Sequence, residues 1–343
     1  MPFVNGKTTL EAVSLGVETV LVTGATGFVG AHVVEALSRT GVSIRAAVRK
    51  SSKLDFLRQF DVEIVTAGLE DEAAMREAVA GSDVVVHLAA ATRASSAEEF
   101  ARANARGTRV VVDSVLHAVP APRKLVYLSS LAAAGPAVNG RPVQPDDEPR
   151  PLTVYGRTKL EGERICQSIA GGGCGVVILR APAVYGPRDR DVYEFFRMAR
   201  FGIMPVPTGG ARPIQMVHVH DLARAVALAA TVDAPTGVYH VAEPRAYLWP
   251  DIGRMVGRAV GRDVRFVRIP ATAFLVAGAV SEFAGAATGR AVLFNRDKAR
   301  ELLAPGWLCE TDAARNRFGF TAEIDLERGL AETAEWYRAN GWL

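Results

Sequence analysis

The sequence has few cysteines. Its 343 residues contain only Cys166, Cys174 and Cys309, which form no CxxC pair and no metal-ligand spacing. So few thiols, in an odd number, argue against a disulfide framework and indicate a reducing compartment. We therefore expect a cytoplasmic protein.

Long hydrophobic runs are also missing. The most apolar run, residues 269–280, is shorter than the roughly 20 residues that a membrane span needs. Residues 1–17 have no basic region followed by an apolar core, so they are not a signal peptide, and we predict a flexible N-terminal extension. We expect no integral membrane segment.

Neither sign of charge is in large excess. The chain has 40 basic and 37 acidic residues and a net charge of +3, and the acidic residues are interspersed among the basic ones. No basic stripe of the nucleic-acid-binding type results, so we expect no nucleic-acid partner. The hydrophobic fraction of 49% excludes a disordered chain.

The first half alternates short runs of Val, Ile and Leu with helix-length segments. Such strands, separated by helices, indicate a parallel sheet covered on both faces, that is, a doubly wound, Rossmann-type α/β fold. The predicted strands are residues 19–23, 42–48, 62–65, 83–89, 124–130 and 175–180, and the predicted helices are residues 28–39, 71–80, 97–118 and 155–170.

Beyond about residue 181, Pro and Gly interrupt this pattern. We predict a main dinucleotide-binding domain of residues 18–180, to which residues 214–242 return. Residues 181–213 and 243–343 then form a smaller, interwoven substrate-binding lobe. Within it, we interpret residues 269–288 as a lid helix over an apolar pocket. The alternative is a helix lying in a membrane surface, which we disfavour because its flanks carry little basic charge.

Three glycines follow the first predicted strand and open the first predicted helix. In TGATGFVG, Gly24, Gly27 and Gly30 permit a tight turn and let backbone N–H groups approach a pyrophosphate at the positive end of a helix. A glycine-rich turn without a ligand is the alternative. The expected cofactor contacts here are Gly24, Thr26, Gly27, Phe28, Val29 and Gly30.

The end of the second predicted strand bears on which dinucleotide binds. NAD-binding proteins usually place an acidic residue about 20 residues beyond the glycines. This chain has Arg49 and Lys50 there, and the nearest acid is Asp55. Cationic groups suit a 2′-phosphate, so we expect NADP(H) in preference to NAD(H). A solvated basic loop is the alternative.

Tyr155 and Lys159 are four residues apart at the start of a predicted helix, which places both on one face. A phenol has an ordinary pKa of about 10, and a nearby ammonium should lower it. Ser130 ends a predicted strand at the edge where such sheets bind ligands. Because side chains alternate along a strand, Ser129 should point away.

Together these motifs resemble those of the extended short-chain dehydrogenases/reductases, in the NAD-dependent epimerase/dehydratase family. The resemblance extends from about residue 19 to residue 343. The matching motifs are TGATGFVG (23–30), HLAA (87–90), NARGT (104–108), YLSSLAAAG (127–135), YGRTK (155–159), RAPAVYGP (180–187) and VHVHDLA (217–223).

The resemblance implies a role for each matching residue. Tyr155 would be the acid/base, Lys159 would bind the nicotinamide ribose and tune Tyr155, and Ser130 would polarise the substrate oxygen. Asn104 would buttress the site. Further cofactor contacts would come from Leu88, Ala89, Ala90, Pro182 and Val184.

Departures from the family pattern bear on the substrate. Nucleotide-sugar epimerases commonly have Asn where this chain has Ala183, and Arg where it has Ile214, although Arg188 or Arg212 could compensate. Three segments are closer to dihydroflavonol-reductase-like and 3β-hydroxysteroid-dehydrogenase-like members: VRKSSKL (48–54), LSSLAAAGP (128–136) and the apolar stretch 269–280. The resemblance thus favours an NADP(H)-dependent oxidoreductase that interconverts a secondary alcohol and a ketone on a hydrophobic, cyclic small molecule. A nucleotide-sugar epimerase/dehydratase with retained NAD and a non-catalytic dinucleotide-sensing module are the alternatives.

Four histidines suggest a metal at first sight. His87, His218, His220 and His240 have no accompanying carboxylate spacing, so we interpret them as core or motif residues and expect no metal. Related proteins often pair through the helices predicted at 97–118 and 155–170, so the resemblance makes a homodimer plausible.

Overall fold

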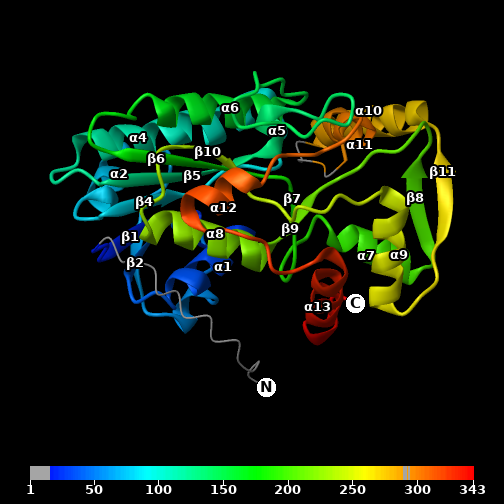
Figure 1. The fold of residues 1–343 in the computed structure, drawn as a ribbon, viewed down its shortest axis with the longest axis horizontal. Coiled ribbons are helices and arrows are strands. Elements are labelled where there is room, and N and C mark those ends of the chain that lie inside the picture. Colours follow the sequence, from blue (N-terminus) through cyan, green and yellow to red (C-terminus); the bar gives the residue numbers. More distant parts are fainter. Residues whose placement is uncertain (1–15, 289–291, 293) are drawn as a thin grey trace.

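The computed structural model describes residues 16–288, 292 and 294–343, without the side chains of 286–288. Residues 1–15 of the predicted N-terminal extension lie outside the described residues. The protein has an α/β fold of the Rossmann type, with a smaller lobe at one end of a central sheet (Figure 1).

The central sheet has seven parallel strands in the order β10-β6-β5-β4-β1-β2-β3. β10, which comes last in sequence among the strands of this sheet, pairs with β6. The chain therefore returns to this sheet after leaving it. The strands are β1 Thr19–Thr23, β2 Ser43–Val48, β3 Val62–Thr66, β4 Val84–His87, β5 Lys124–Ser130, β6 Gly175–Ala181 and β10 Gly237–His240.

Helices cover both faces of this sheet because alternate side chains of each strand point to opposite faces and both sets are buried. In β1, Val20 and Val22 face a core shared with α1, α8 and α12, whereas Leu21 faces a core shared with α2, α4 and α6. The helices themselves can be found in Figure 1. These helices are α1 Phe28–Leu37, α2 Glu72–Val79, α4 Gly107–His117, α6 Val154–Gln167, α8 Val219–Thr231 and α12 Asp312–Phe318.

The smaller lobe has a core of its own, built from aromatic and aliphatic side chains such as Phe196, Tyr247 and Tyr337. Two parallel pairs of strands, β8 with β11 and β7 with β9, lie in this part. The elements are β7 Ala183–Tyr185, α7 Tyr193–Arg200, β8 Ile203–Pro207, β9 Met216–His218, α9 Trp249–Val260, β11 Arg265–Ile269, α10 Ala271–Thr288, α11 Arg296–Leu303 and α13 Leu326–Ala339.

The predicted helix 97–118 differs from the observed one. It is divided into α3 (Ala97–Phe100), a π-helical segment η2 (Ala101–Arg106) and α4. Of residues 214–242, predicted to return to the main domain, the strand β9 pairs with β7 and does not join the central sheet, whereas β10 does. Two short elements complete the described fold, the 3-10 turn η1 (Leu57–Gln59) and α5 (Leu131–Ala134).

Candidate active site

The glycine turn after β1 is tight because other backbone crowds it. Gly24 has a φ of +73°, and a Cβ atom there would lie 2.7 Å from the nitrogen of Ala89. A Cβ atom at Gly30 would lie 2.0 Å from the carbonyl oxygen of Gly24. Neither position accepts a side chain without a backbone shift, and the turn lies directly against the predicted cofactor segment of residues 88–90.

The N-terminus of α1 has the features of an anion site. Its N-cap, Gly27, makes no side-chain capping hydrogen bond, and the first turn contains no acidic residue. The N–H groups of Phe28 and Val29 are therefore not capped by a side chain, and the positive end of the helix is not neutralised. This cradle of glycine and free helix end fits the pyrophosphate of a dinucleotide.

Arg49 and Lys50 directly follow β2, at the same carboxyl edge of the sheet as the glycine turn, and both are exposed. The backbone N–H of Arg49 donates to Ser52 Oγ at 3.1 Å, which shapes the turn. Among the described residues, no carboxylate lies within ion-pair distance of either cation. Both are thus available to an anionic ligand.

Ser130 and Tyr155 meet at the carboxyl end of β5. The Ser130 hydroxyl accepts a hydrogen bond from the N–H of Ala132 at 3.1 Å and lies close enough to the Tyr155 phenol to lower its pKa. Ser129 points the opposite way and donates to a carboxylate oxygen of Glu163 at 2.5 Å. Only one of the two serines therefore faces Tyr155.

Lys159 is buried in the next turn of α6. Its ammonium donates to the carbonyl oxygen of Leu128 at 2.7 Å and lies 4.1 Å from the ring centre of Tyr127. Burial lowers the pKa of Lys159 to about 8. The hydrogen bond of this ammonium thus goes to β5.

The pKa of Tyr155 departs from the sequence-based expectation. Burial of the phenol raises it to about 12; the neighbouring Ser130 hydroxyl opposes this rise and the carboxylate of Glu301 adds to it. The expectation that Lys159 lowers this pKa is wrong in this structure, because burial dominates and the ammonium is engaged with Leu128. At neutral pH the phenol is protonated.

Asn104 connects two parts of the site. Its amide nitrogen donates to the Ala91 carbonyl and to Thr158 Oγ1, both at 3.1 Å, and its amide oxygen accepts from the Ala91 N–H at 2.7 Å. Asn104 therefore ties the loop after β4 to the helix that contains Tyr155. These contacts make it a positioning residue.

The segment of Pro182 to Val184 lies beside the serine. Ala181, the last residue of β6, is paired with Ser130 in the sheet, and the chain then passes through the buried Pro182 into β7. The cofactor contacts predicted at Pro182 and Val184 are thus close to Ser130 and Tyr155.

Two acidic residues of α11 border the site and were not found from the sequence. The N–H of Val154 donates to Asp297 Oδ2 at 2.7 Å, and Thr153 Oγ1 donates to Glu301 Oε1 at 3.4 Å. Both acids lie at the N-terminus of α6, beside Tyr155. The sequence offered no signal for this contact beyond two acids spaced by one helical turn.

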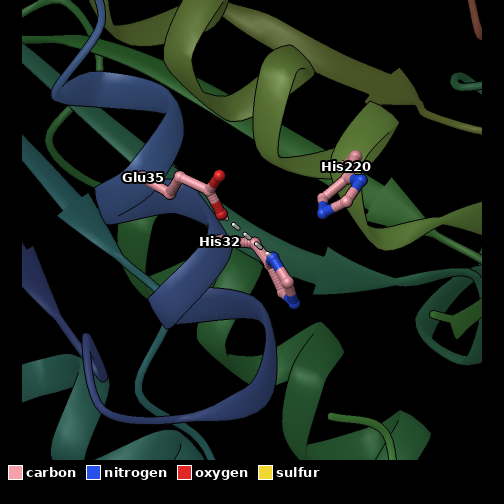
Figure 2. A group of neighbouring side chains, drawn as sticks. All are labelled: His32, Glu35 and His220. Atoms are coloured by element: carbon pink, nitrogen blue, oxygen red, sulfur yellow. Dashed lines mark ion pairs between the residues drawn. The ribbon is translucent and has the colours of Figure 1, made fainter. Parts of the chain in front are cut away.

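The histidines do lie near carboxylates in space. His32, Glu35 and His220, drawn in Figure 2, form one group, and His218, His220 and Glu332 form another; in each, the ligand atoms lie within 4.8 Å of one another. In two of these rings one nitrogen has a protein contact, and the other, Nδ1 of His32 and Nε2 of His218, is buried without a hydrogen-bond partner. His32 Nε2 lies 3.0 Å from the Pro187 carbonyl oxygen, and His218 Nδ1 accepts from the His220 N–H at 3.4 Å. The absence of a metal stays a prediction.

Comparison with known proteins places these features in a family. Residues 20–242 match the model of the "NAD dependent epimerase/dehydratase family". The chain belongs to this family. It is therefore an NAD(P)-dependent oxidoreductase of the extended short-chain dehydrogenase/reductase type. The glycine turn and the uncapped N–H groups at the start of α1 are consistent with a nicotinamide dinucleotide cofactor.

Individual relatives cover nearly the whole chain. A ceramide reductase of Caulobacter vibrioides is 32% identical over 328 residues, covering 94% of this chain and 96% of the relative. A decarboxylating sterol-4-alpha-carboxylate 3-dehydrogenase of Candida albicans is 26% identical and covers 94% and 98%. The structure of MoeE5 in complex with UDP-glucuronic acid and NAD aligns with a TM-score of 0.74 at 25% identity, covering 94% and 99%.

Within the described part of the chain, no helix combines the length and the apolar character needed to span a bilayer.

Proposed function

We propose that the protein interconverts a ketone and a secondary alcohol on a hydrophobic small molecule, with NADP(H) as the hydride carrier. The observation that supports this most directly is that Ser130 and Tyr155 lie together at the carboxyl edge of the sheet, the same edge that carries the glycine turn. This edge is where open α/β sheets bind their ligands.

A bound nicotinamide dinucleotide supplies the hydride. Ser130 holds the substrate oxygen, since the contact with the Ala132 N–H uses a lone pair and leaves the hydroxyl proton free to donate. Tyr155, protonated at neutral pH, gives its phenolic proton to that oxygen during reduction. Lys159, positively charged below a pKa of about 8, would bind the ribose of the nicotinamide nucleotide.

A hydrophobic substrate is supported by what the relatives act on. The names of two of them specify a ceramide and a sterol carboxylate, and both are lipids, the second of them cyclic. The arginines that could replace a missing diphosphate ligand are engaged elsewhere. Arg212 donates to the carbonyls of Thr208 and Leu303 at 3.0 and 3.3 Å, and Arg188 lies 4.2 Å from the ring centre of Phe56.

The preference for NADP(H) is supported by Arg49 and Lys50, which are exposed and unpaired with acids in the described structure. A guanidinium can bind a phosphate through two parallel hydrogen bonds, which a ribose hydroxyl cannot match.

The alternative is nucleotide-sugar epimerisation or dehydration, favoured by the similarity to MoeE5. One experiment distinguishes the two activities. Purified protein is incubated with NADPH and, in separate reactions, with a panel of cyclic and long-chain ketones or with UDP-sugars. We expect stoichiometric NADPH oxidation with a ketone and none with the sugars. Conversion of a UDP-sugar without net cofactor turnover would instead establish the alternative.

A further inference from the structure

Helix α10 is apolar on all sides yet lies at the surface. Among its residues, Ala271 to Thr288, Glu282 is the only charged one. A helix that is hydrophobic all round is normally buried in a core or in lipid. Here, however, Val276, Val280 and Phe283 are 63%, 64% and 78% exposed. Their spacing of four and three residues places them in one stripe, which we call the α10 stripe.

The opposite side of α10 is packed against the active site through α11. Glu282 forms an ion pair with Arg296 at 3.0 Å, and a Cβ atom at Gly278 would lie 2.7 Å from the carbonyl oxygen of Asn295. α11 in turn contacts the N-terminus of α6 through Asp297, beside Tyr155. Figure 1 shows α10 and α11 together near α5, at the end of the molecule that holds the smaller lobe. The α10 stripe is thus the outer surface of the layer beside the catalytic tyrosine.

Positive charge lies on both sides of this helix in the sequence, although the three basic residues of α11 each form an ion pair with a carboxylate. Residues 265–303 contain six basic and three acidic side chains, an excess of +3 that equals the net charge of the entire chain. The expectation that the flanks of the helix carry little basic charge is therefore wrong. Arg265 and Arg268, just before α10, are exposed, and no carboxylate among the described residues forms an ion pair with either.

We propose that the α10 stripe docks on an anionic lipid bilayer, with Arg268, three residues before the helix, against the headgroups and Phe283, Val280 and Val276 in the acyl boundary. This rests on the proposed function, since a lipid-like substrate resides in a bilayer and would reach Tyr155 from there. A helix with apolar residues flanked by arginines binds anionic membrane surfaces by combining burial with electrostatic attraction.

A second copy of the chain fits this face less well. A twofold contact places the same patch on both sides of the interface, so the excess of positive charge would face itself. An anionic bilayer complements both the apolar stripe and its charge.

The proposal is tested by sedimentation of the full chain with vesicles of phosphatidylcholine alone or of phosphatidylcholine with phosphatidylglycerol. We expect binding to the anionic vesicles that weakens with salt. The double variant Val280→Glu/Phe283→Glu should bind them on the order of tenfold or more weakly, because two apolar side chains no longer enter the lipid. The matched control is Leu116→Glu/Val119→Glu, which places the same two charges at exposed apolar residues at the end of α4 and just after it, and it should bind like the unmodified protein.

Fluorescence titration with NADPH, which requires an intact fold, shows whether the double variant remains folded. Equal vesicle binding by the double variant and the control overturns the proposal, as does no binding of the unmodified protein to anionic vesicles. So does a dimer in sedimentation velocity that only the double variant dissociates, because the stripe would then join two copies. Vesicle binding is measured without substrate turnover. A negative ketone assay would therefore contradict the proposed function without changing the result of the vesicle experiment.

Discussion

Tyr155 is the residue on which the proposed proton transfer depends. Tyr155→Phe removes the phenolic oxygen but keeps the ring that lies beside Phe100, with ring centres 6.1 Å apart. Loss of general acid catalysis typically costs about 10² to 10⁴-fold in rate, so we expect kcat for ketone reduction to fall by that factor. NADPH affinity, measured by fluorescence titration, should change little.

The control for this variant is Tyr239→Phe, which removes a phenol that donates to the Pro235 carbonyl at 2.8 Å in another part of the molecule. Its kcat should equal that of the unmodified protein. If Tyr155→Phe turns over at the normal rate, Tyr155 is not the proton donor.

Arg49 decides the cofactor preference in the proposed function. A hydrogen bond to a charged partner contributes about 1.5 to 3 kcal/mol, so Arg49→Asp should weaken NADPH binding by roughly 10 to 150-fold and improve NADH relative to NADPH. The dissociation constants of both cofactors provide the measurement. Arg76→Asp, at an exposed arginine of α2, is the matched control and should change neither. An unaltered NADPH constant in Arg49→Asp would refute the assignment to the 2′-phosphate.

At the scale of elements, α11 acts on the electrostatics of α6. Glu301 raises the pKa of Tyr155, so Glu301→Gln should lower this pKa and increase the phenolate fraction at a given pH. Alcohol oxidation needs the phenolate as base. Its kcat/KM should therefore rise at lower pH in Glu301→Gln than in the unmodified protein.

The measurement is the pH profile of alcohol oxidation, with Glu323→Gln, a carboxylate on another segment, as the control expected to keep the original profile. A profile that stays in place, or that moves to higher pH, would show that Glu301 does not influence Tyr155. A merely structural loss would lower the rate at all pH values without moving the profile.

Local sequence patterns predicted the elements that depend on local forces. Runs of Val and Ile located the parallel strands within a few residues, because both faces of such strands are buried. The π-helical segment could not be predicted in this way, since Asn104 within it bonds to Ala91 and Thr158, which lie far away in sequence. The pairing of β9 with β7 could not be predicted either, because it joins residues about 30 positions apart in the sequence.

At the scale of the whole molecule, the site is assembled from segments spread over most of the chain. Ser130 and Tyr155 were predictable because one ends a strand and the other begins a helix, and both signals are local. The positions of Asp297 and Glu301 depend on how α11 packs on α6, more than 140 residues away. The raised pKa of Tyr155 likewise follows from burial, which the spacing to Lys159 does not reveal.

Asp221 joins α8 to the segment that enters α13, and so ties the main sheet to the smaller lobe. One carboxylate oxygen accepts from the N–H groups of Glu323 and Ile324 at 3.0 and 2.9 Å, and the other accepts from Arg224 at 2.8 Å. Asp221 is buried, so its loss leaves these donors without their acceptor. Because such unsatisfied groups are costly, Asp221→Ala should lower the free energy of unfolding by about 2 to 4 kcal/mol.

Urea denaturation measures this effect as a lower midpoint with an unchanged slope, provided that unfolding is two-state. Asp221→Asn keeps an acceptor oxygen without the charge, so its loss of stability should be intermediate. Asp61→Ala, at an exposed aspartate of a loop, should differ from the unmodified protein by less than about 0.5 kcal/mol. If Asp221→Ala is as stable as Asp61→Ala, the two parts of the molecule are held together by their apolar contacts, and the carboxylate at the start of α8 has no role in joining them.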